Sequence, residues 1–209
     1  LGCADCPMAV VQRPAERLEA RANNAVQYAM GMMRSEFAQL DANLADDFSQ
    51  VLAGQCIYLP NFCCASQDLA LFEGLKADLQ LNIEEGMVNW SKHLKHETPD
   101  FSPTFQKIIA QLSDYFDVEV YASRLNFYRD GTDWKPFHHD SHAYGGKAKR
   151  EDFTVGASFG ARRDLAFLHE PSGRTFAFPQ QNGDVFAFTS EVNHRFKHGV
   201  PRAKAKDGA

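Results

Sequence analysis

The sequence predicts an α+β fold in which N-terminal helices pack on a double-stranded β-helix, or jelly roll. In three segments between residues 14 and 116, apolar residues recur every three or four positions, which is typical of amphipathic helices. From Val118 the apolar spacing falls to two, and short strand candidates alternate with turn-forming residues. Helices followed by many short strands favour an α+β layout with two stacked sheets.

The first helical segment covers residues 14–49. Pro14 suits a first helical turn, and Gly31 is a plausible bend in a stretch that is long for one globular helix. We expect residues 1–50 to form a helical extension and residues 51–209 to form the jelly-roll domain. The apolar stripe of 14–49 is expected to pack on that domain; a homodimer seam is the alternative.

The middle of the chain predicts a strand at 56–62, then a helix capped by Ser66. Residues 83–101 are expected to form a strand or loop that flanks the mouth of a site. Ser102 followed by Pro103 is a favourable start for the next helix, whose apolar face runs to Phe116.

The second half predicts a series of short strands joined by tight turns. Turn residues at 171–173 and 182–183 are expected to close hairpins. The strand candidates are 118–128, 153–159, 165–169, 175–178 and 185–189.

Composition narrows the class of protein. The formal net charge of −5 argues against a generally basic nucleic-acid binder. The charge is uneven: residues 1–120 carry 8 Lys/Arg against 17 Asp/Glu, whereas residues 121–209 carry 14 against 10. The basic half is suited to an anionic ligand such as a dicarboxylate. Apolar runs are too short for a membrane span, and no secretory signal is visible, so we expect no membrane partner.

The 5 cysteines form no regular framework. Free thiols in a reducing compartment are the simplest interpretation, which predicts an intracellular protein, cytoplasmic or nuclear. Cys3 and Cys6 resemble half of a zinc knuckle without its second half, and a floppy terminus is the favoured alternative.

His138 and Asp140 form an H-x-D pair, and His198 follows much later. Residues two apart in a strand point to the same side, so this imidazole and carboxylate can meet one metal ion. A distant second histidine would complete the facial triad of non-haem Fe(II) oxygenases. His194 is an alternative distal ligand, and His142 is a further residue at the mouth. Asn126 and Tyr128, two apart on a strand face, are suited to hydrogen-bond a carboxylate.

Five segments in order resemble the AlkB-like group of Fe(II)- and 2-oxoglutarate-dependent dioxygenases, in a less characterised eukaryotic-type branch. The resemblance covers roughly residues 55–209. Its segments are Asn126-x-Tyr128-x-Asp130-Gly131, His138-x-Asp140, 158–167, 182–188 and 198–202.

This resemblance implies that His138, Asp140 and His198 bind Fe(II) and that Asn126 and Tyr128 contact 2-oxoglutarate, with O2 as cosubstrate. It also places Arg163 near the substrate, with Trp134 and His142 as further substrate-side candidates. Family members carry a later arginine that pairs with the far carboxylate of 2-oxoglutarate. We expect that arginine to lie beyond Ala209; Arg202, Lys204 and Lys206 are substitutes by charge.

The implied activity is hydroxylation or oxidative demethylation of an alkylated nucleobase or single-stranded nucleic acid. Protein or small-molecule hydroxylation by the same fold is one alternative, and a catalytically silent binding protein is another. A cupin-like zinc site built on residues 138–142 is disfavoured, because it leaves the other four segments unexplained.

Overall fold

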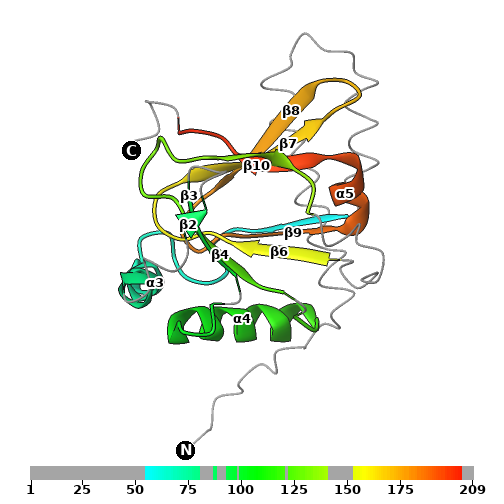
Figure 1. The fold of residues 1–209 in the computed structure, drawn as a ribbon. Coiled ribbons are helices and arrows are strands. Elements are labelled where there is room, and N and C mark those ends of the chain that lie inside the picture. The colour runs from blue at the N-terminus through cyan, green and yellow to red at the C-terminus, as the bar shows by residue number, and fades with distance from the viewer. Residues whose placement is uncertain are drawn as a thin grey trace, which may run out of the picture.

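The computed structural model describes residues 55–80, 87–88, 93–97, 99–120, 122–140 and 153–203, and contains three sheets and three helices in these ranges. One sheet has the order β1-β9-β6, from β1 (Cys56–Leu59), β9 (Val185–Thr189) and β6 (Phe153–Ala157). A second has the order β5-β10-β7-β8, from β5 (Lys135–His138), β10 (Lys197–Val200), β7 (Arg163–His169) and β8 (Arg174–Gln180). These two antiparallel sheets are the stacked layers of the predicted jelly roll (Figure 1).

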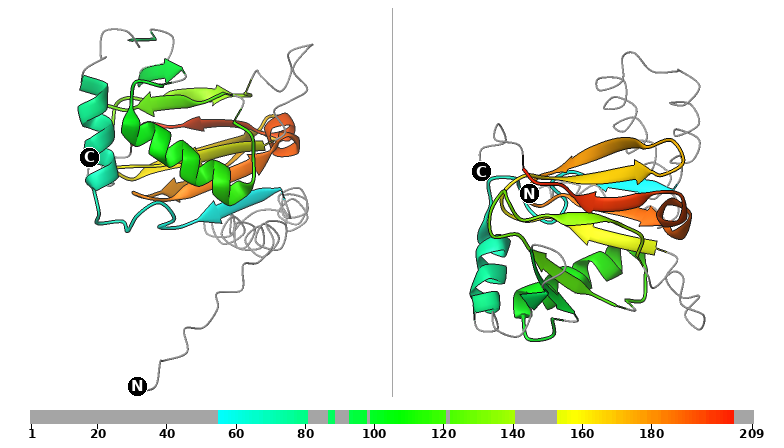
Figure 2. Two further views of the ribbon diagram at one scale, coloured as in Figure 1. Left: turned by 90° about the horizontal axis from the view of Figure 1, so that it is seen from below. Right: turned by 45° about the horizontal axis from the view of Figure 1, so that its top comes forward.

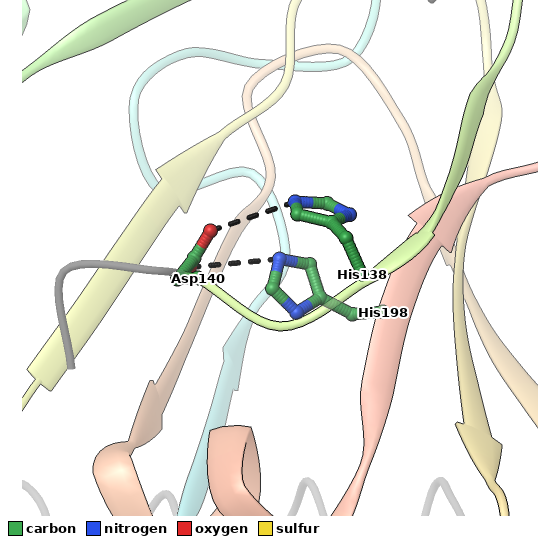
Figure 3. Close-up of side chains that lie close together, drawn as sticks. All are labelled: His138, Asp140 and His198. Carbon is green, nitrogen blue, oxygen red and sulfur yellow. Dashed lines mark ion pairs between the residues drawn. The ribbon is translucent and has the colours of Figure 1, made fainter. Parts of the chain in front are cut away.

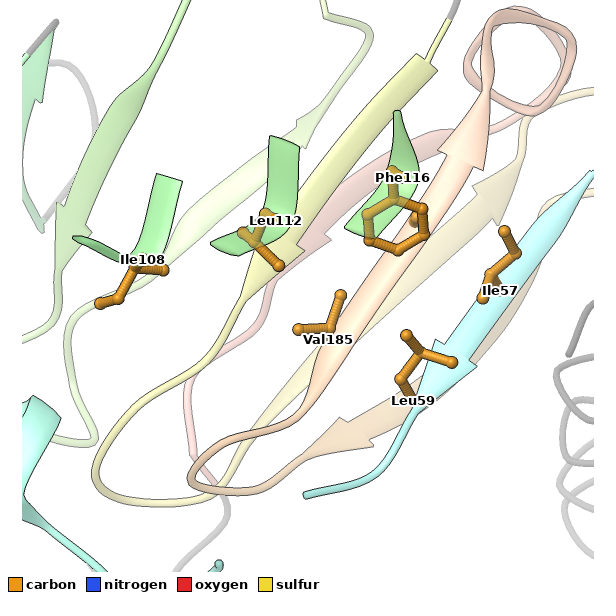
Figure 4. Packing of buried hydrophobic residues seen from close by; sticks show 7 residues of the cluster. Ile57, Leu59, Ile108, Leu112, Phe116 and Val185 are labelled. Atoms are coloured by element: carbon orange, nitrogen blue, oxygen red, sulfur yellow. The ribbon is translucent and has the colours of Figure 1, made fainter. Parts of the chain in front are cut away.

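Strand β9 is buried on both faces, which explains its unbroken apolar sequence VFAF. Val185 and Ala187 point to one side and pack against α4 (Pro103–Phe116), in a cluster that also contains residues of β1 (Figure 4). Phe186 and Phe188 point to the other side, as the two-residue period of a strand requires.

A phenylalanine cluster fills the space between the two stacked sheets. Phe167 of β7 is fully buried, and its ring contacts the rings of Phe186 and Phe188 from β9 at centroid distances of 5.6 and 5.7 Å. Burying an aromatic side chain contributes on the order of 2–3 kcal/mol. This cluster therefore fixes the spacing of the sheets on which the site is built.

A third sheet, order β2-β3-β4, consists of β2 (Met87–Val88), β3 (His93–Glu97) and β4 (Arg124–Phe127). One face of it is apolar: Leu125 packs with Leu79 of α3 (Ala70–Gln80) and Phe105 of α4. The opposite face is polar and carries His93, Lys95, Glu97, Arg124 and Asn126. Figure 2 shows the two helices lying beside this sheet.

Of the two predicted helix caps, Ser102 is confirmed and Ser66 is wrong. Ser102 caps α4, accepting a hydrogen bond from the backbone N–H of Phe105 at 3.0 Å, and Pro103 occupies the first turn. The other helix begins at Ala70, whose N–H donates to Asp68 at 3.0 Å, so Asp68 rather than Ser66 provides the cap. A carboxylate at this position also interacts favourably with the helix dipole.

The two predicted hairpin turns have different outcomes. Residues 171–173 join β7 to β8, which pair along their whole length. Residues 182–183 do not close a hairpin, because β8 and β9 belong to different sheets. At this crossing Gly183 has a φ of 84°, and an added Cβ would lie 2.2 Å from the Cys64 carbonyl oxygen. The turn glycine serves a sheet-to-sheet connection rather than a hairpin.

The predicted helix at 14–49, with its proposed dimer seam, lies outside the described residues. Among the described residues no helix is both long and apolar enough to cross a membrane.

Candidate metal centre

Two neighbouring strands and the residues after one of them bring His138, Asp140 and His198 together. His138 is the last residue of β5, and His198 lies directly opposite it on β10. Asp140 follows β5 by two residues. Residues opposite each other in an antiparallel pair share a face, so both imidazoles point into the space between the sheets.

The three side chains converge on one point (Figure 3). His138 Nε2 lies 3.5 Å from Asp140 Oδ1, and His198 Nε2 lies 3.6 Å from Asp140 Oδ2. One ligand atom from each residue fits within 4.8 Å of the others. These separations are too long for good hydrogen bonds. Three ligands at about 2.1 Å on one face of an octahedral ion are roughly 3 Å apart, so a small contraction would seat an ion.

A hydrogen bond to the backbone leaves one ring nitrogen of His138 available to bind a metal ion. The Nδ1–H of His138 donates to the Pro136 carbonyl oxygen at 2.9 Å, which leaves the lone pair of Nε2 facing Asp140. This Nε2 is buried and has no hydrogen-bond partner within the described part of the chain. A buried nitrogen without a partner costs free energy, and a metal ion bound there would satisfy it.

Charge states at the site also suit a cation. Burial acts to raise the pKa of Asp140, but the neighbouring imidazoles of His138 and His198 outweigh it and hold the pKa well below its usual range. Burial lowers the pKa of His198, against the opposing pull of Asp140. An ionised carboxylate beside a neutral imidazole is the protonation state in which these groups bind metal ions.

A residue that the sequence did not reveal, Asn193, holds Asp140 in place. Asn193 lies in α5 (Ser190–Arg195) and is buried. Its Oδ1 accepts from the Asp140 N–H at 2.9 Å, and its Nδ2 donates to the Asp140 carbonyl oxygen at 3.2 Å. Its own carbonyl oxygen accepts from His139 Nδ1 at 2.5 Å. The side-chain amide thus pairs with the backbone of the metal-site segment much as a neighbouring strand would.

Asn126 and Tyr128 gather around His93 on the polar face of the third sheet. His93 Nε2–H donates to Asn126 Oδ1 at 3.1 Å, and the His93 ring stacks on Tyr128 with centroids 5.1 Å apart. Burial lowers the pKa of His93 and raises that of Tyr128, so both are neutral near pH 7. Asn126 and Tyr128 thus both contact His93 on one side of the sheet.

The Arg163 side chain contacts other residues of the protein. Its guanidinium lies 4.9 Å from the Tyr128 ring centroid and donates to the carbonyl oxygens of Asp133 and Pro201, each at 2.7 Å. These bonds tie the loop before β5 to the residues after β10. Trp134 lies under the Arg202 guanidinium at 6.0 Å, and its indole N–H is buried without a partner among the described residues.

The remaining candidate residues either lie away from the three-residue cluster or fall outside the described residues. His194, the alternative distal ligand, is exposed on α5 and is not part of the three-residue cluster. His142, Cys3 and Cys6 lie outside the described residues, as do Lys204 and Lys206. No sequence pattern pointed to Asn193, because the residue that it holds, Asp140, lies 53 positions away in the chain.

The chain matches one known protein family and resembles several solved structures. The sequence model of the 2OG-Fe(II) oxygenase superfamily matches residues 41–208, most of the chain. No curated protein sequence matches.

Three solved structures are similar to the chain. They are a prolyl-4-hydroxylase from Pseudomonas putida (14% identity, TM-score 0.46, covering 71% of this chain and 85% of that one), an oxidoreductase of the 2OG-Fe(II) oxygenase family from Burkholderia pseudomallei (16%, 0.44, 79% and 86%), and the epimerase SnoN of nogalamycin biosynthesis in complex with Fe3+ and alpha ketoglutarate (15%, 0.46, 88% and 80%).

The family model covers all three converging residues, and their donor set of two imidazoles and one carboxylate is one that suits non-haem iron. The chain belongs to the 2OG-Fe(II) oxygenase superfamily, and it is an enzyme that uses Fe(II) and 2-oxoglutarate.

Proposed function

We propose that His138, Asp140 and His198 hold the iron of this enzyme, and that Asn126 and Tyr128 contact 2-oxoglutarate. The observation that carries the iron assignment is the convergence of two Nε2 atoms on one carboxylate, each within 3.6 Å of it. For Asn126 and Tyr128 the support is their shared cluster with His93, which lies near enough to Lys135 of β5 for that ammonium to help lower the pKa of His93.

Bound iron supplies the oxidation: with O2 and 2-oxoglutarate, a C–H bond of the substrate is hydroxylated while succinate and CO2 are released. The chain's own residues orient and protect the site. The Pro136 carbonyl keeps the proton of His138 on Nδ1, and Asn193 fixes the backbone of Asp140. Phe188, whose ring centroid is 5.1 Å from that of His198, excludes water from one side.

Succinate formation tests this assignment. Purified protein supplied with Fe(II), ascorbate and 2-oxoglutarate is expected to release succinate, measured by NMR, even without a primary substrate. Asp140→Ala should lose both succinate formation and Fe(II) binding measured anaerobically. Asp164→Asn, which changes a β7 carboxylate that faces Arg162, is the matched control and should retain both. Full Fe(II) binding by Asp140→Ala would refute the proposed ligand set.

For the substrate we propose an N-alkyl group on a nucleobase or on single-stranded nucleic acid, in the manner of the AlkB-like group. The order of the segments around Asn126, His138 and His198 supports this class, as does the excess of basic residues after position 120. Hydroxylation of a methyl carbon on nitrogen gives a hemiaminal, which releases formaldehyde and the dealkylated base. The aromatic ring of Trp134 is a candidate stacking surface.

A product screen decides the substrate class. The wild-type protein is incubated with methylated nucleosides, methylated single-stranded oligonucleotides, peptides and small acids, and products are analysed by mass spectrometry. Formaldehyde release from a methylated base supports the proposal. Addition of one oxygen to a peptide or small molecule, with no action on any base, would replace it with the hydroxylase alternative.

A further inference from the structure

His93 contacts both Asn126 and Tyr128 from the neighbouring strand. The register of β3 and β4 pairs Leu94 with Phe127. The residue before Leu94 on β3, His93, therefore lies opposite Tyr128, which directly follows β4. Opposite residues of an antiparallel pair share a face, as do residues two apart on one strand, so the His93 ring lies over Tyr128 and reaches Asn126 diagonally.

The hydrogen bond from His93 occupies the acceptor of the Asn126 side chain. His93 Nε2–H donates to Asn126 Oδ1 at 3.1 Å, and His93 is only 2% exposed. A side-chain amide has a carbonyl oxygen at one end and an NH2 group with two donors at the other. Because the oxygen faces His93, the NH2 group faces away from it.

The donors of Asn126 and Tyr128 remain available to a ligand. Asn126 is exposed, and its Nδ2 makes no hydrogen bond within the described ranges. The Tyr128 hydroxyl likewise makes none with the residues that the structure describes. An ionised carboxylate only accepts hydrogen bonds, so an amide NH2 group and a hydroxyl presented together are complementary to it.

The position of one proton decides which end of the amide faces that ligand. Burial lowers the pKa of His93, and the charge of Lys135 acts in the same sense, so the ring is neutral near pH 7 and has a single N–H. A proton on Nε2 selects Asn126 Oδ1 as its partner. A proton on Nδ1 would make Nε2 an acceptor, and the amide would have to turn its oxygen toward the ligand.

We propose that His93 is a positioning residue for the cosubstrate: it holds the Asn126 carbonyl oxygen, so that the amide NH2 group faces 2-oxoglutarate. This inference rests on the proposed contact between Asn126 and 2-oxoglutarate and adds a residue that acts through that contact. Without the His93 donor the amide can rotate, and its oxygen would repel a cosubstrate carboxylate.

The orientation of Asn126 depends on His93 more than that of Tyr128 does. The bond to His93 is the only hydrogen bond that the Asn126 side chain makes within the described part of the chain. The Tyr128 ring has a second neighbour, the Arg163 guanidinium, at 4.9 Å. A phenylalanine in place of His93 would keep a ring against Tyr128 and remove the donor to Asn126. This substitution therefore isolates the step through Asn126.

Binding of 2-oxoglutarate to the Mn(II)-loaded protein, measured by isothermal titration calorimetry without turnover, tests the inference. In His93→Phe the dissociation constant for 2-oxoglutarate should rise roughly 10-fold, the effect of one hydrogen bond to a charged group. His93→Gln should stay within about 3-fold of wild type, because its amide can donate to Asn126 Oδ1 from a position close to that of Nε2. Mn(II) affinity should be unchanged in both variants.

His96→Phe is the matched control. His96 is also buried on β3, but it lies three positions from His93 and therefore on the opposite face of the strand. This variant should keep wild-type affinity for 2-oxoglutarate. Urea unfolding of both phenylalanine variants separates a general loss of stability, which the two can share, from the loss of cosubstrate affinity.

A double-mutant cycle shows whether His93 acts through Asn126. Asn126→Ala alone should weaken 2-oxoglutarate binding roughly 10-fold. Adding His93→Phe to it should change the affinity little, whereas two independent effects would multiply to about 100-fold.

Proton–nitrogen correlation NMR of isotope-labelled, metal-free wild type examines the same residue without relying on a substituted ring. Near pH 7 the His93 ring should have its proton on Nε2, and its signals are assigned by their absence from the His93→Gln spectrum.

Wild-type affinity in His93→Phe, a full additional loss in the double variant, or a proton on Nδ1 would each overturn the inference. If Asn126→Ala binds 2-oxoglutarate as wild type does, the proposed cosubstrate contact fails and the inference fails with it. The iron assignment is tested separately by Asp140→Ala and does not depend on either result.

Discussion

Removing the Asn193 side chain tests whether a residue that touches no metal ion controls metal affinity. Asn193→Ala deletes two hydrogen bonds to the Asp140 backbone, at 2.9 and 3.2 Å, from a side chain that is only 2% exposed. The Asp140 N–H and carbonyl oxygen then lose their partners beside the site. Leaving one buried polar group unsatisfied costs about 1–3 kcal/mol.

This change should affect stability and metal affinity together. Residues that orient metal ligands typically contribute 10- to 100-fold in affinity. We therefore expect the dissociation constant for Mn(II) or Fe(II), titrated anaerobically, to rise by about that factor, equivalent to about 1.4–2.8 kcal/mol. The free energy of unfolding of the metal-free protein, from urea titration, should fall by about 1–3 kcal/mol.

Asn182→Ala separates metal positioning from general destabilisation. Asn182 is buried like Asn193 and ties two loops together, accepting from Gly160 N–H at 2.9 Å and donating to the Asp68 carbonyl oxygen at 2.7 Å. It lies before β9, whereas Asn193 lies after it, so the two residues are at opposite ends of that strand. Asn182→Ala should lose comparable stability and retain wild-type metal affinity. Equal metal affinity in both variants would refute the positioning role of Asn193.

Two further predictions concern the strands and the loop around the site. Gly199→Ala places a methyl group against β5 carbonyl oxygens and should lower the free energy of unfolding by about 1–3 kcal/mol in urea titration, with weaker metal binding; Gly156→Ala, whose Cβ would meet only one atom at 3.8 Å, should change neither. The hydrogen bond from Arg129 holds the pKa of Asp133 below its usual range, against burial, so this pair stabilises the fold above the unfolded-state pKa of about 3.9 and loses that contribution as the pH falls through the lower folded-state pKa. Arg129→Met should therefore destabilise the protein more at pH 7 than at pH 3, and an equal loss at both values would contradict this explanation.

Local patterns in the sequence were sufficient for the fold class and for the pair His138 and Asp140, whereas the choice of His198 over His194 came from the family resemblance. The two-residue spacing of His138 and Asp140 is the one that lets two strand side chains bind the same metal ion. The strand at 185–189 was predicted with its observed bounds. Ser102 and Pro103 mark a helix start through bonds to their own neighbours. Each of these signals is short-range, so a single chain read in order contains it.

Only the tertiary structure decided what the remaining residues contact. By strict alternation, Lys135 and His138 are three apart and belong on opposite faces of β5; the irregular pairing with β10 brings them to the same face. Asn193 meets the Asp140 backbone across 53 positions, and His93 meets Asn126 across 33. Such contacts depend on strand register and on the packing of sheets, which arise from the summed burial of many side chains and leave no local pattern in the sequence.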